Sequence, residues 1–244
     1  MFQGFSDETF EFFMAIRFNN NREFFQSNRD WYLRAVREPC LALAEALNPA
    51  VEALDDELER RPGRVVSRIN RDIRFSHDKS PYRDYIWLAF RRPGEQRSTT
   101  LGVYFDISAS GAAWGMGYYA ENRAMMNGLR RRLLAEPDTF LNLWQPVTEE
   151  FPLHVERPIK RLPIPESLHP ALRQWYPMRS FYLQRDCRDF ALMKSPKLAD
   201  AIADGFAKLA PMYRYLTGIV PEPDADLTRE VTEPMSLTAG GSSE

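Results

Sequence analysis

The fold is decided by residues 101–118, which run LGVYFDISASGAAWGMGY. Large apolar residues alternate with others over 101–107, and Asp106 falls on the second, more polar face, as in a half-buried strand. Residues 110–111, Ser-Gly, signal a turn, and residues 114–118 then predict the return strand of a hairpin. One apolar and one polar face predict an antiparallel sheet that helices cover on one side only.

Further strands are predicted on both sides of this hairpin. The alternation over Val65–Phe75 predicts a strand with Ile69 and Ile73 on one face, and shorter strands are expected at Ile86–Phe90 and Ser180–Gln184. No helix separates the strands in the middle of the chain, which argues against a doubly wound parallel sheet. Glycines 115 and 117 would leave one sheet face open, so that a ligand or another backbone could lie flat on it.

Helices are predicted at both ends of the chain. Ser6 and Asn20 are the expected N-caps of the first two helices, with breaks or kinks expected at Pro39 and Pro49. Helices are also expected from Glu121 to Trp144 and from Ser195-Pro196 to Gly218. Six prolines between Pro152 and Pro177 predict an extended loop there. The pattern predicts one α+β domain over residues 1–220, with a mostly antiparallel sheet whose one face is covered by N- and C-terminal helices.

Composition excludes several classes of protein. The 244 residues hold 32 Lys and Arg against 34 Asp and Glu, a net charge of −2, with 44% hydrophobic residues. Such a chain is neither disordered, fibrous nor membrane-spanning, and it is not a uniformly basic polyanion binder. The small net charge is the sum of oppositely charged segments, because Asp7–Glu59 carries −7 and Arg60–Arg92 carries +7. Residues 221–244 carry −5 and predict a disordered acidic tail.

The expected compartment is the cytoplasm. The N-terminus lacks the basic flank and apolar segment of a signal peptide. Cys40 and Cys187 lie far apart in no metal-binding or redox motif, as is typical of reduced intracellular thiols.

The most unusual stretch is Arg68–Arg83, RINRDIRFSHDKSPYR. Guanidinium groups bind phosphate and carboxylate bidentately, and lysine, serine and tyrosine add further donors. The expected ligand-binding residues are Arg68, Arg71, Arg74, Ser76, Lys79, Tyr82 and Arg83. Asp72 is the candidate catalytic residue, either orienting an arginine or acting as an acid–base group.

Two other interpretations of this stretch stay open. The arginines could simply pair with the acidic helices as a structural clamp, or the basic strip with its aromatic residues could bind single-stranded nucleic acid, which is the least favoured reading. Asp72 and Asp106 could also approach one another in the sheet as paired carboxylates, although pairing of Asp72 with its neighbouring arginines is favoured. No metal site, cofactor or dinucleotide fingerprint is expected.

Arg71, Asp72, Arg74, Phe75, Ser76 and the run Lys79–Tyr82, together with Asn20, Asn21 and Arg22, carry a resemblance to a known family. They resemble a bacterial family of conserved hypothetical proteins, domain of unknown function 2461, over about Phe2 to Leu216. Phe24 stands where that family typically has Trp, and His77 where it typically has Lys. The second difference removes a permanent charge from the expected site. The family name implies no activity.

The sequence therefore favours binding of an anionic small molecule, phosphate- or carboxylate-bearing, at the Arg/Lys-rich stretch. If the protein is an enzyme, phosphate-ester or nucleotide chemistry suits these residues better than oxidation. The alternative is a non-enzymatic interaction or regulatory protein whose arginines clamp helices to sheet. No membrane partner is expected, nucleic acid is disfavoured, and protein partners are not indicated.

Overall fold

The computed structural model describes residues 1–74, 78–94, 100–156 and 158–222, and a five-stranded antiparallel sheet lies at its centre. The strand order is β1-β2-β3-β5-β4. The hairpin predicted from residues 101–118 is confirmed as β2 and β3, whereas β4 lies in the proline-rich stretch expected to be loop. The strands are β1 (Tyr85–Phe90), β2 (Leu101–Ser108), β3 (Gly111–Tyr118), β4 (Leu153–Glu156) and β5 (Ser180–Cys187).

Helices precede, interrupt and follow the sheet in the sequence. The N-terminal group is α1 (Asp7–Phe18), α2 (Arg22–Ser27), α3 (Arg29–Tyr32), a π-helical turn η1 (Leu33–Arg37), α4 (Glu38–Leu54) and α5 (Pro62–Val65). Between β3 and β5 lie α6 (Arg123–Ala135), α7 (Pro137–Trp144) and the 3-10 turns η2 (Gln145–Val147) and η3 (Pro170–Leu172). The chain continues through α8 (Phe190–Met193) and α9 (Lys197–Thr217).

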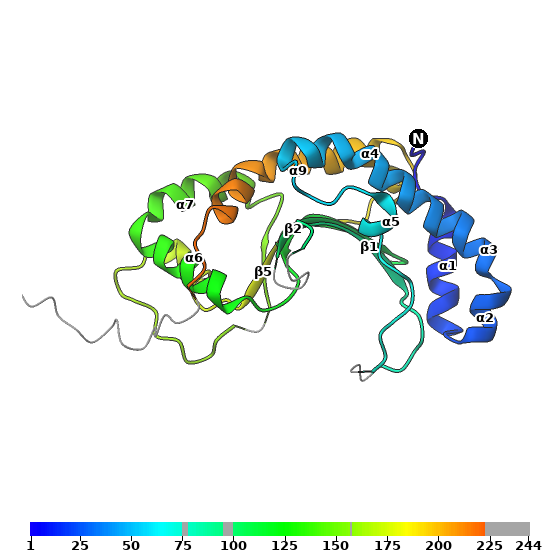
Figure 1. The fold of residues 1–244 in the computed structure, drawn as a ribbon, viewed down its shortest axis with the longest axis horizontal. Coiled ribbons are helices and arrows are strands. Elements are labelled where there is room, and N and C mark those ends of the chain that lie inside the picture. Colours follow the sequence, from blue (N-terminus) through cyan, green and yellow to red (C-terminus); the bar gives the residue numbers. More distant parts are fainter. Residues whose placement is uncertain (75–77, 95–99, 157, 223–244) are drawn as a thin grey trace, which may run out of the picture.

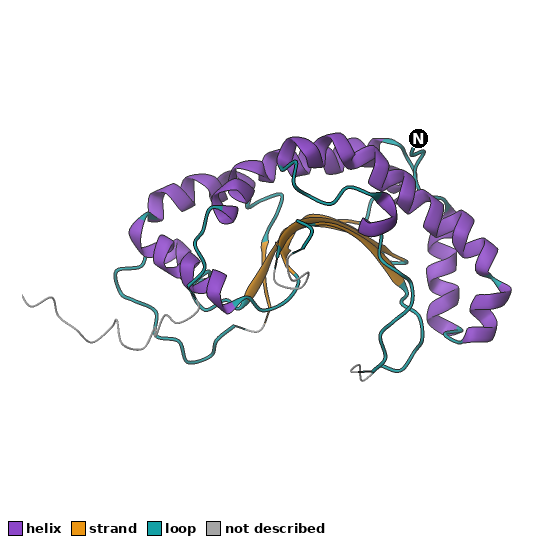
Figure 2. Cartoon of the chain, in the orientation of Figure 1, coloured by secondary structure: helices purple, strands orange, loops and turns teal. Residues whose placement is uncertain are grey.

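The sheet is an arch whose convex side carries the long helices α4 and α9 (Figure 1 and Figure 2). Val103, Phe105 and Ile107 of β2 are fully buried on that side, as are Phe206 and Leu209 of α9. The α+β class with one covered face is therefore confirmed. The helices α1 to α3 stand at one end of the arch, and α6 and α7 at the other (Figure 1).

Glycines allow the arch to bend sharply at its middle strand. A Cβ at Gly115 would lie 1.9 Å from the Leu183 carbonyl oxygen, and one at Gly117 would lie 2.3 Å from that of Phe181. Real Cβ atoms essentially never come within 3.0 Å of a heavy atom, so no other residue fits while β3 and β5 keep this approach. The sheet face that carries these glycines is the inner face of the arch.

The strand predicted over Val65–Phe75 is wrong as a regular element. In its described residues, 65–74, this segment makes two isolated bridges, Val66 with Leu88 and Asn70 with Tyr82, beside the edge strand β1. Ile69 is 3% exposed as expected, whereas Ile73 is 39% exposed and faces solvent. Backbone hydrogen bonds join Ser67 to Trp87, Ile69 to Arg83 and Arg71 to Pro81, but they do not form a continuous ladder.

Two details of the N-terminal helices also differ from expectation. The N-cap of α2 is Asn21, whose side chain accepts from the Phe24 amide at 2.8 Å. Asn20 instead bonds in both directions to the Tyr82 backbone, donating to its carbonyl at 2.9 Å and accepting from its amide at 3.0 Å. The helix α4 continues through Pro49 without ending there.

The two ends of the described chain are both tied to distant elements. The Phe5 amide donates to the Met193 carbonyl at 2.9 Å, and Asp7 pairs with Lys194 at 2.9 Å. Glu222, at the start of the predicted tail, pairs with Arg131 of α6 at 2.8 Å. Residues 223–244 of that tail lie outside the described residues. No helix in the described ranges has the length and apolar character needed to cross a membrane.

Candidate functional site

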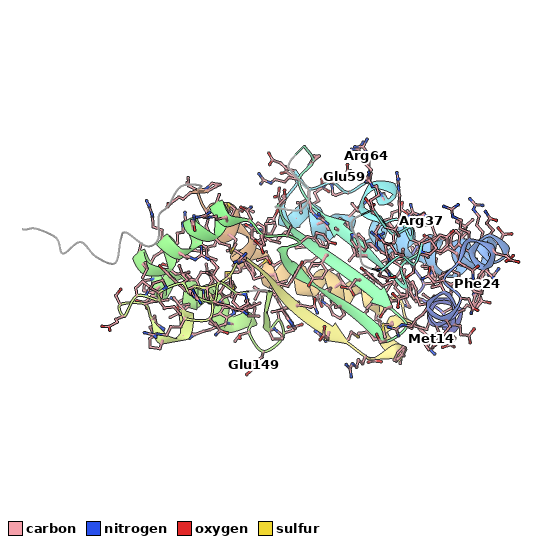
Figure 3. All side chains as sticks on the ribbon, turned by 90° about the horizontal axis from the view of Figure 1, so that it is seen from below. Met14, Phe24, Arg37, Glu59, Arg64 and Glu149 are labelled. Atoms are coloured by element: carbon pink, nitrogen blue, oxygen red, sulfur yellow. The ribbon has the colours of Figure 1, made fainter. Side chains whose placement is uncertain are left out.

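The uncovered inner side of the arch, called here the concave face, presents the alternate residues of each strand. Figure 3 looks onto it, with the strands in front of α9. The face carries Tyr85, Trp87 and Ala89 of β1; Gly102, Tyr104 and Asp106 of β2; Ala113, Gly115 and Gly117 of β3; Tyr182, Gln184 and Asp186 of β5; and His154 of β4. The register of the strands places these residues, except Tyr85, in three rows across the sheet.

The first row has a floor of glycine and a basic group at each end. Gly102 pairs with Gly117, which pairs with Tyr182, which in turn pairs with His154. The Arg91 side chain lies against Gly102, since a Cβ added there would be 2.6 Å from Arg91 Cγ. We call this set the glycine row. The Tyr182 ring likewise lies against Gly117, so a guanidinium, a phenol ring and an imidazole line this row.

The second row contains two hydrogen-bonded side chains that cross the middle of the sheet, called here the Tyr104–Gln184 bar. Tyr104 and Gln184 both pair with Gly115 on the intervening strand. The missing Gly115 side chain lets the Tyr104 hydroxyl reach across and donate to Gln184 Oε1 at 2.6 Å. Gln184 Nε2 then donates to Asp186 at 2.7 Å. This chain fixes the amide orientation and keeps Asp186 as an acceptor.

The third row holds two carboxyl groups on either side of Ala113, namely Asp106 and Asp186. Within the described residues, the half-buried Asp106 carboxyl makes no hydrogen bond or ion pair. Burial and the Asp186 carboxylate raise the pKa of Asp106 to about 7. A carboxyl poised near neutrality can accept or donate a proton under ordinary conditions.

Asp55, in contrast to Asp106, is a carboxyl group whose hydrogen bonds compensate for its burial. It accepts from Arg92 Nε at 2.9 Å and from the Tyr213 hydroxyl at 2.8 Å, and these bonds outweigh burial and lower its pKa. Asp106 has no such compensation and therefore costs the fold free energy. Groups left uncompensated in this way are concentrated at functional sites.

The concave face is hollowed into a pocket of about 350 Å³. Members of all three rows line it, among them Arg91, His154, Tyr104, Gln184 and Asp106. This volume lies within the range of about 300–1,000 Å³ that is typical of small-molecule sites. Tyr85, Trp87 and Tyr182 add flat aromatic surface to the same pocket.

A second depression, of about 630 Å³, is lined mostly by residues that follow β4 and precede β5 in the chain. Lys160, Arg161 and Arg179 line it together with Glu121. Glu121 pairs with Arg179 at 3.3 Å, which leaves a net positive charge on this wall. Asp106 and Asp186 of the third row lie at the other end of the strands. The inner side of the arch therefore carries basic groups at one end and acidic groups at the other.

The Arg-rich stretch is largely bonded to itself. Arg71 pairs with Asp78 at 3.0 Å, Lys79 Nζ donates to the Ile73 carbonyl at 2.9 Å, and Arg83 donates to the Arg68 carbonyl at 3.0 Å. These contacts occupy cationic groups that the sequence assigned to a ligand.

The remaining expected ligand-binding residues are dispersed. The Arg68 side chain is exposed, and Arg74 is exposed and binds Asp72 through two nitrogens at 3.0 and 2.7 Å. The Tyr82 ring is 6% exposed and stacks on Phe25 with centroids 4.3 Å apart. Ser76 lies outside the described residues.

Arg83 is the member of this stretch that contacts the concave face. Its guanidinium lies over the Trp87 ring, 4.7 Å from the centroid, and Trp87 lines the pocket. The loop therefore lies beside the concave face next to β1, on the side of the N-terminal helices (Figure 1).

Asp72, the candidate catalytic residue, lies in the exposed loop. Hydrogen bonds from Arg74 lower the pKa of Asp72 to about 2. Such a carboxylate can orient the guanidinium but stays ionised at neutral pH, which does not suit proton transfer. The carboxylate that acts on Asp106 is Asp186, not Asp72.

Sequence reasoning singled out Asp106 and the glycines but missed Arg91, His154, Gln184 and Asp186. The alternation of Tyr182, Gln184 and Asp186 on a short strand was the available signal, since it places three polar groups on one face. In the described part of the chain, no three His, Cys, Asp or Glu side chains gather as metal ligands do.

Comparisons with known proteins locate the chain in a family. No curated protein matches it. A family model described as a conserved hypothetical protein, DUF2461, matches residues 8–215, which include every strand of the sheet, all of α4 and all but the last two residues of α9. The hollow and polar sheet face thus lies within the matched region, and the chain belongs to the DUF2461 family of conserved hypothetical proteins.

Proposed function

We propose that this protein binds an anionic small molecule, carrying a phosphate or carboxylate group, on the concave face. The observation that carries the proposal is the pocket of about 350 Å³, which Arg91 and His154 line at the glycine row. The Arg91 guanidinium supplies paired donors of the geometry that carboxylate and phosphate accept.

The aromatic side chains describe the rest of the ligand. Tyr104 and Tyr182 meet edge to face with centroids 5.7 Å apart, and Trp87 lies 5.8 Å from Tyr85. A flat or extended body can pack on these rings while its anionic group reaches Arg91. A nucleotide is one ligand of this kind, and if the protein is an enzyme, Asp106 is the group in the pocket best suited to proton transfer.

Isothermal titration with phosphate, benzoate and AMP tests the proposal. We expect Arg91→Ala to weaken binding by about tenfold or more, because it removes a charge-assisted contact, with Arg74→Ala as the matched control outside the pocket. Thermal denaturation of each variant checks the fold. Loss of binding in Arg74→Ala and not in Arg91→Ala would place the site at the Arg-rich stretch. Negligible heats for all three anions would refute anion binding.

The self-bonded contacts of the Arg-rich stretch favour a second role for it, a structural clamp. Arg71 holds Asp78, and the Tyr82 backbone bonds to Asn20 of the N-terminal helices. A clamp predicts that Arg71→Ala lowers the melting temperature and leaves the titration unchanged. A ligand role for Arg71 predicts the reverse.

A further inference from the structure

The pocket on the concave face has opposite charges at its two ends. Arg91 and His154 flank the glycine row, whereas Asp106 lies four residues along β2 from Gly102. At about 3.3 Å per residue, the two ends are about 13 Å apart along the strand. The Tyr104–Gln184 bar lies between them.

Among the described residues, no element packed around the Asp106 end supplies a counter-charge to it. On β2 its neighbour on the same face is Tyr104, on β1 it faces Trp87, and on β3 it faces Ala113. Asp186 on β5 adds a second negative charge, and Arg83 lies on Trp87 without bonding to Asp106. Elsewhere in the described chain, Asp55, Glu59 and Glu150 each pair with arginine or lysine.

We propose that the ligand of the concave face is dipolar, with its anionic group over the glycine row and an ammonium or guanidinium group bound at Asp106. The proposal rests on the proposed function, which assigns the anionic end. It adds that the missing counter-charge of Asp106 is brought by the ligand itself.

The middle of the pocket sets the shape of such a ligand. Tyr104 and Gln184 line the pocket between its two charged ends, so the linking portion of the ligand passes over them in an extended form. An extended chain advances about 3.3–3.6 Å per residue, so a peptide of about four residues has its charged ends at the required separation. Shorter peptides can satisfy only one end.

Binding of a cation at Asp106 should change the number of protons that the protein holds. With a pKa of about 7 in the free protein, the carboxyl is about half protonated at pH 7. An arriving ammonium favours the ionised form, so binding releases about half a proton to the buffer. A ligand that placed an acceptor at Asp106 would instead drive proton uptake, so the two cases differ in sign.

Unbranched alanine peptides of two to five residues are suitable probes. Each is used with free termini, with an acetylated N-terminus and with an amidated C-terminus, so that one charge is removed at a time. Titration at pH 7 in two buffers of different ionisation enthalpy gives both the affinity and the number of protons exchanged. The proteins are wild type, Asp106→Asn, Arg91→Ala and, as a control on the exposed loop, Asp72→Asn.

We expect the free tetrapeptide to bind most tightly and to release about half a proton. N-acetylation or Asp106→Asn should each weaken binding by about tenfold or more and abolish the proton release, and Asp72→Asn should change neither. C-amidation should weaken binding to a similar degree through loss of the contact with Arg91.

Three results would overturn the dipolar ligand while leaving anion binding intact. They are equal affinity of free and acetylated peptides, proton uptake in place of release, and no peptide binding where phosphate or benzoate still binds in an Arg91-dependent way. If neither peptides nor simple anions bind, the proposed function itself fails and the dipolar ligand falls with it.

Discussion

Replacing Asp106 with asparagine should make the protein more stable, and increasingly so as the pH rises. Asparagine has nearly the shape of a protonated aspartate but cannot ionise, so the substitution removes the cost of a buried charge beside Asp186. Removing an unpaired polar charge from a site that binds ligand is expected to improve the fold at the expense of function.

The size of the effect follows from the pKa of Asp106. It is about 7 in the fold against an ordinary 3.8, and this difference of about three pKa units corresponds to about 4 kcal/mol at 1.36 kcal/mol per unit. Relaxation of the half-buried site makes this an upper limit, and about 2–4 kcal/mol is expected. Because the folded pKa is the higher one, the wild type loses this free energy as the pH rises from about 4 through 7.

Urea denaturation at several pH values between 5 and 8.5, followed by tryptophan fluorescence, measures the difference between variant and wild type. The gain in the free energy of unfolding should be largest at pH 8.5 and smallest at pH 5. Asp72→Asn is the control without pH dependence, because the pKa of Asp72 is lowered to about 2 and its carboxyl therefore stays ionised, folded or unfolded, throughout this pH range. A pH-independent difference for Asp106→Asn would show that its carboxyl is solvated, and would refute the reasoning.

Two further substitutions test the arch and the link between loop and helices. Gly115→Ala should lower the free energy of unfolding by about 2 kcal/mol or more, because its Cβ would collide with the Leu183 carbonyl, whereas Gly63→Ala meets no atom within 4 Å and should be nearly neutral. Equal stability of the two would contradict the curvature argument. Asn20→Ala should lower the free energy of unfolding by about 2 kcal/mol, because both bonds to Tyr82 are lost. Asn19→Ala, measured by the same urea denaturation, should lower it by about 0.5 kcal/mol. A small effect at Asn20 would remove it as an anchor of the loop.

The fold was predictable where one strand face packs on helices. Val103, Phe105 and Ile107 alternate in the sequence because α4 and α9 bury that face, so local spacing reports the tertiary contact. The segment 65–75 misled for a physical reason, since its polar residues alternate as in a strand although its described part forms isolated bridges and no continuous ladder.

The pocket was much harder to foresee. Tyr104 and Gln184 are 80 residues apart, and only the register of β2, β3 and β5 brings them together. Asp106 could be noticed as a carboxyl on a polar face, but its neighbour Asp186 could not be chosen among the acids of the chain. The many charges of the Arg-rich stretch drew attention to a loop beside the sheet. The pocket instead depends on a few groups that are spaced across all five strands.

The bond from Phe5 to Met193 and the pair Asp7–Lys194 constrain the order of events during synthesis. The partners in the ion pair are 187 residues apart, so α1 cannot reach its final position until nearly the whole folded region has left the ribosome. The central strand β3 likewise waits for β5, and such distant pairings slow folding. Until then Phe10 of the first helix lacks its contact with the Phe190 ring, whose centroid lies 4.9 Å from that of Phe10 in the finished molecule. The nascent chain thus has a long interval in which a chaperone that shields an aromatic N-terminal helix would raise the yield of native protein.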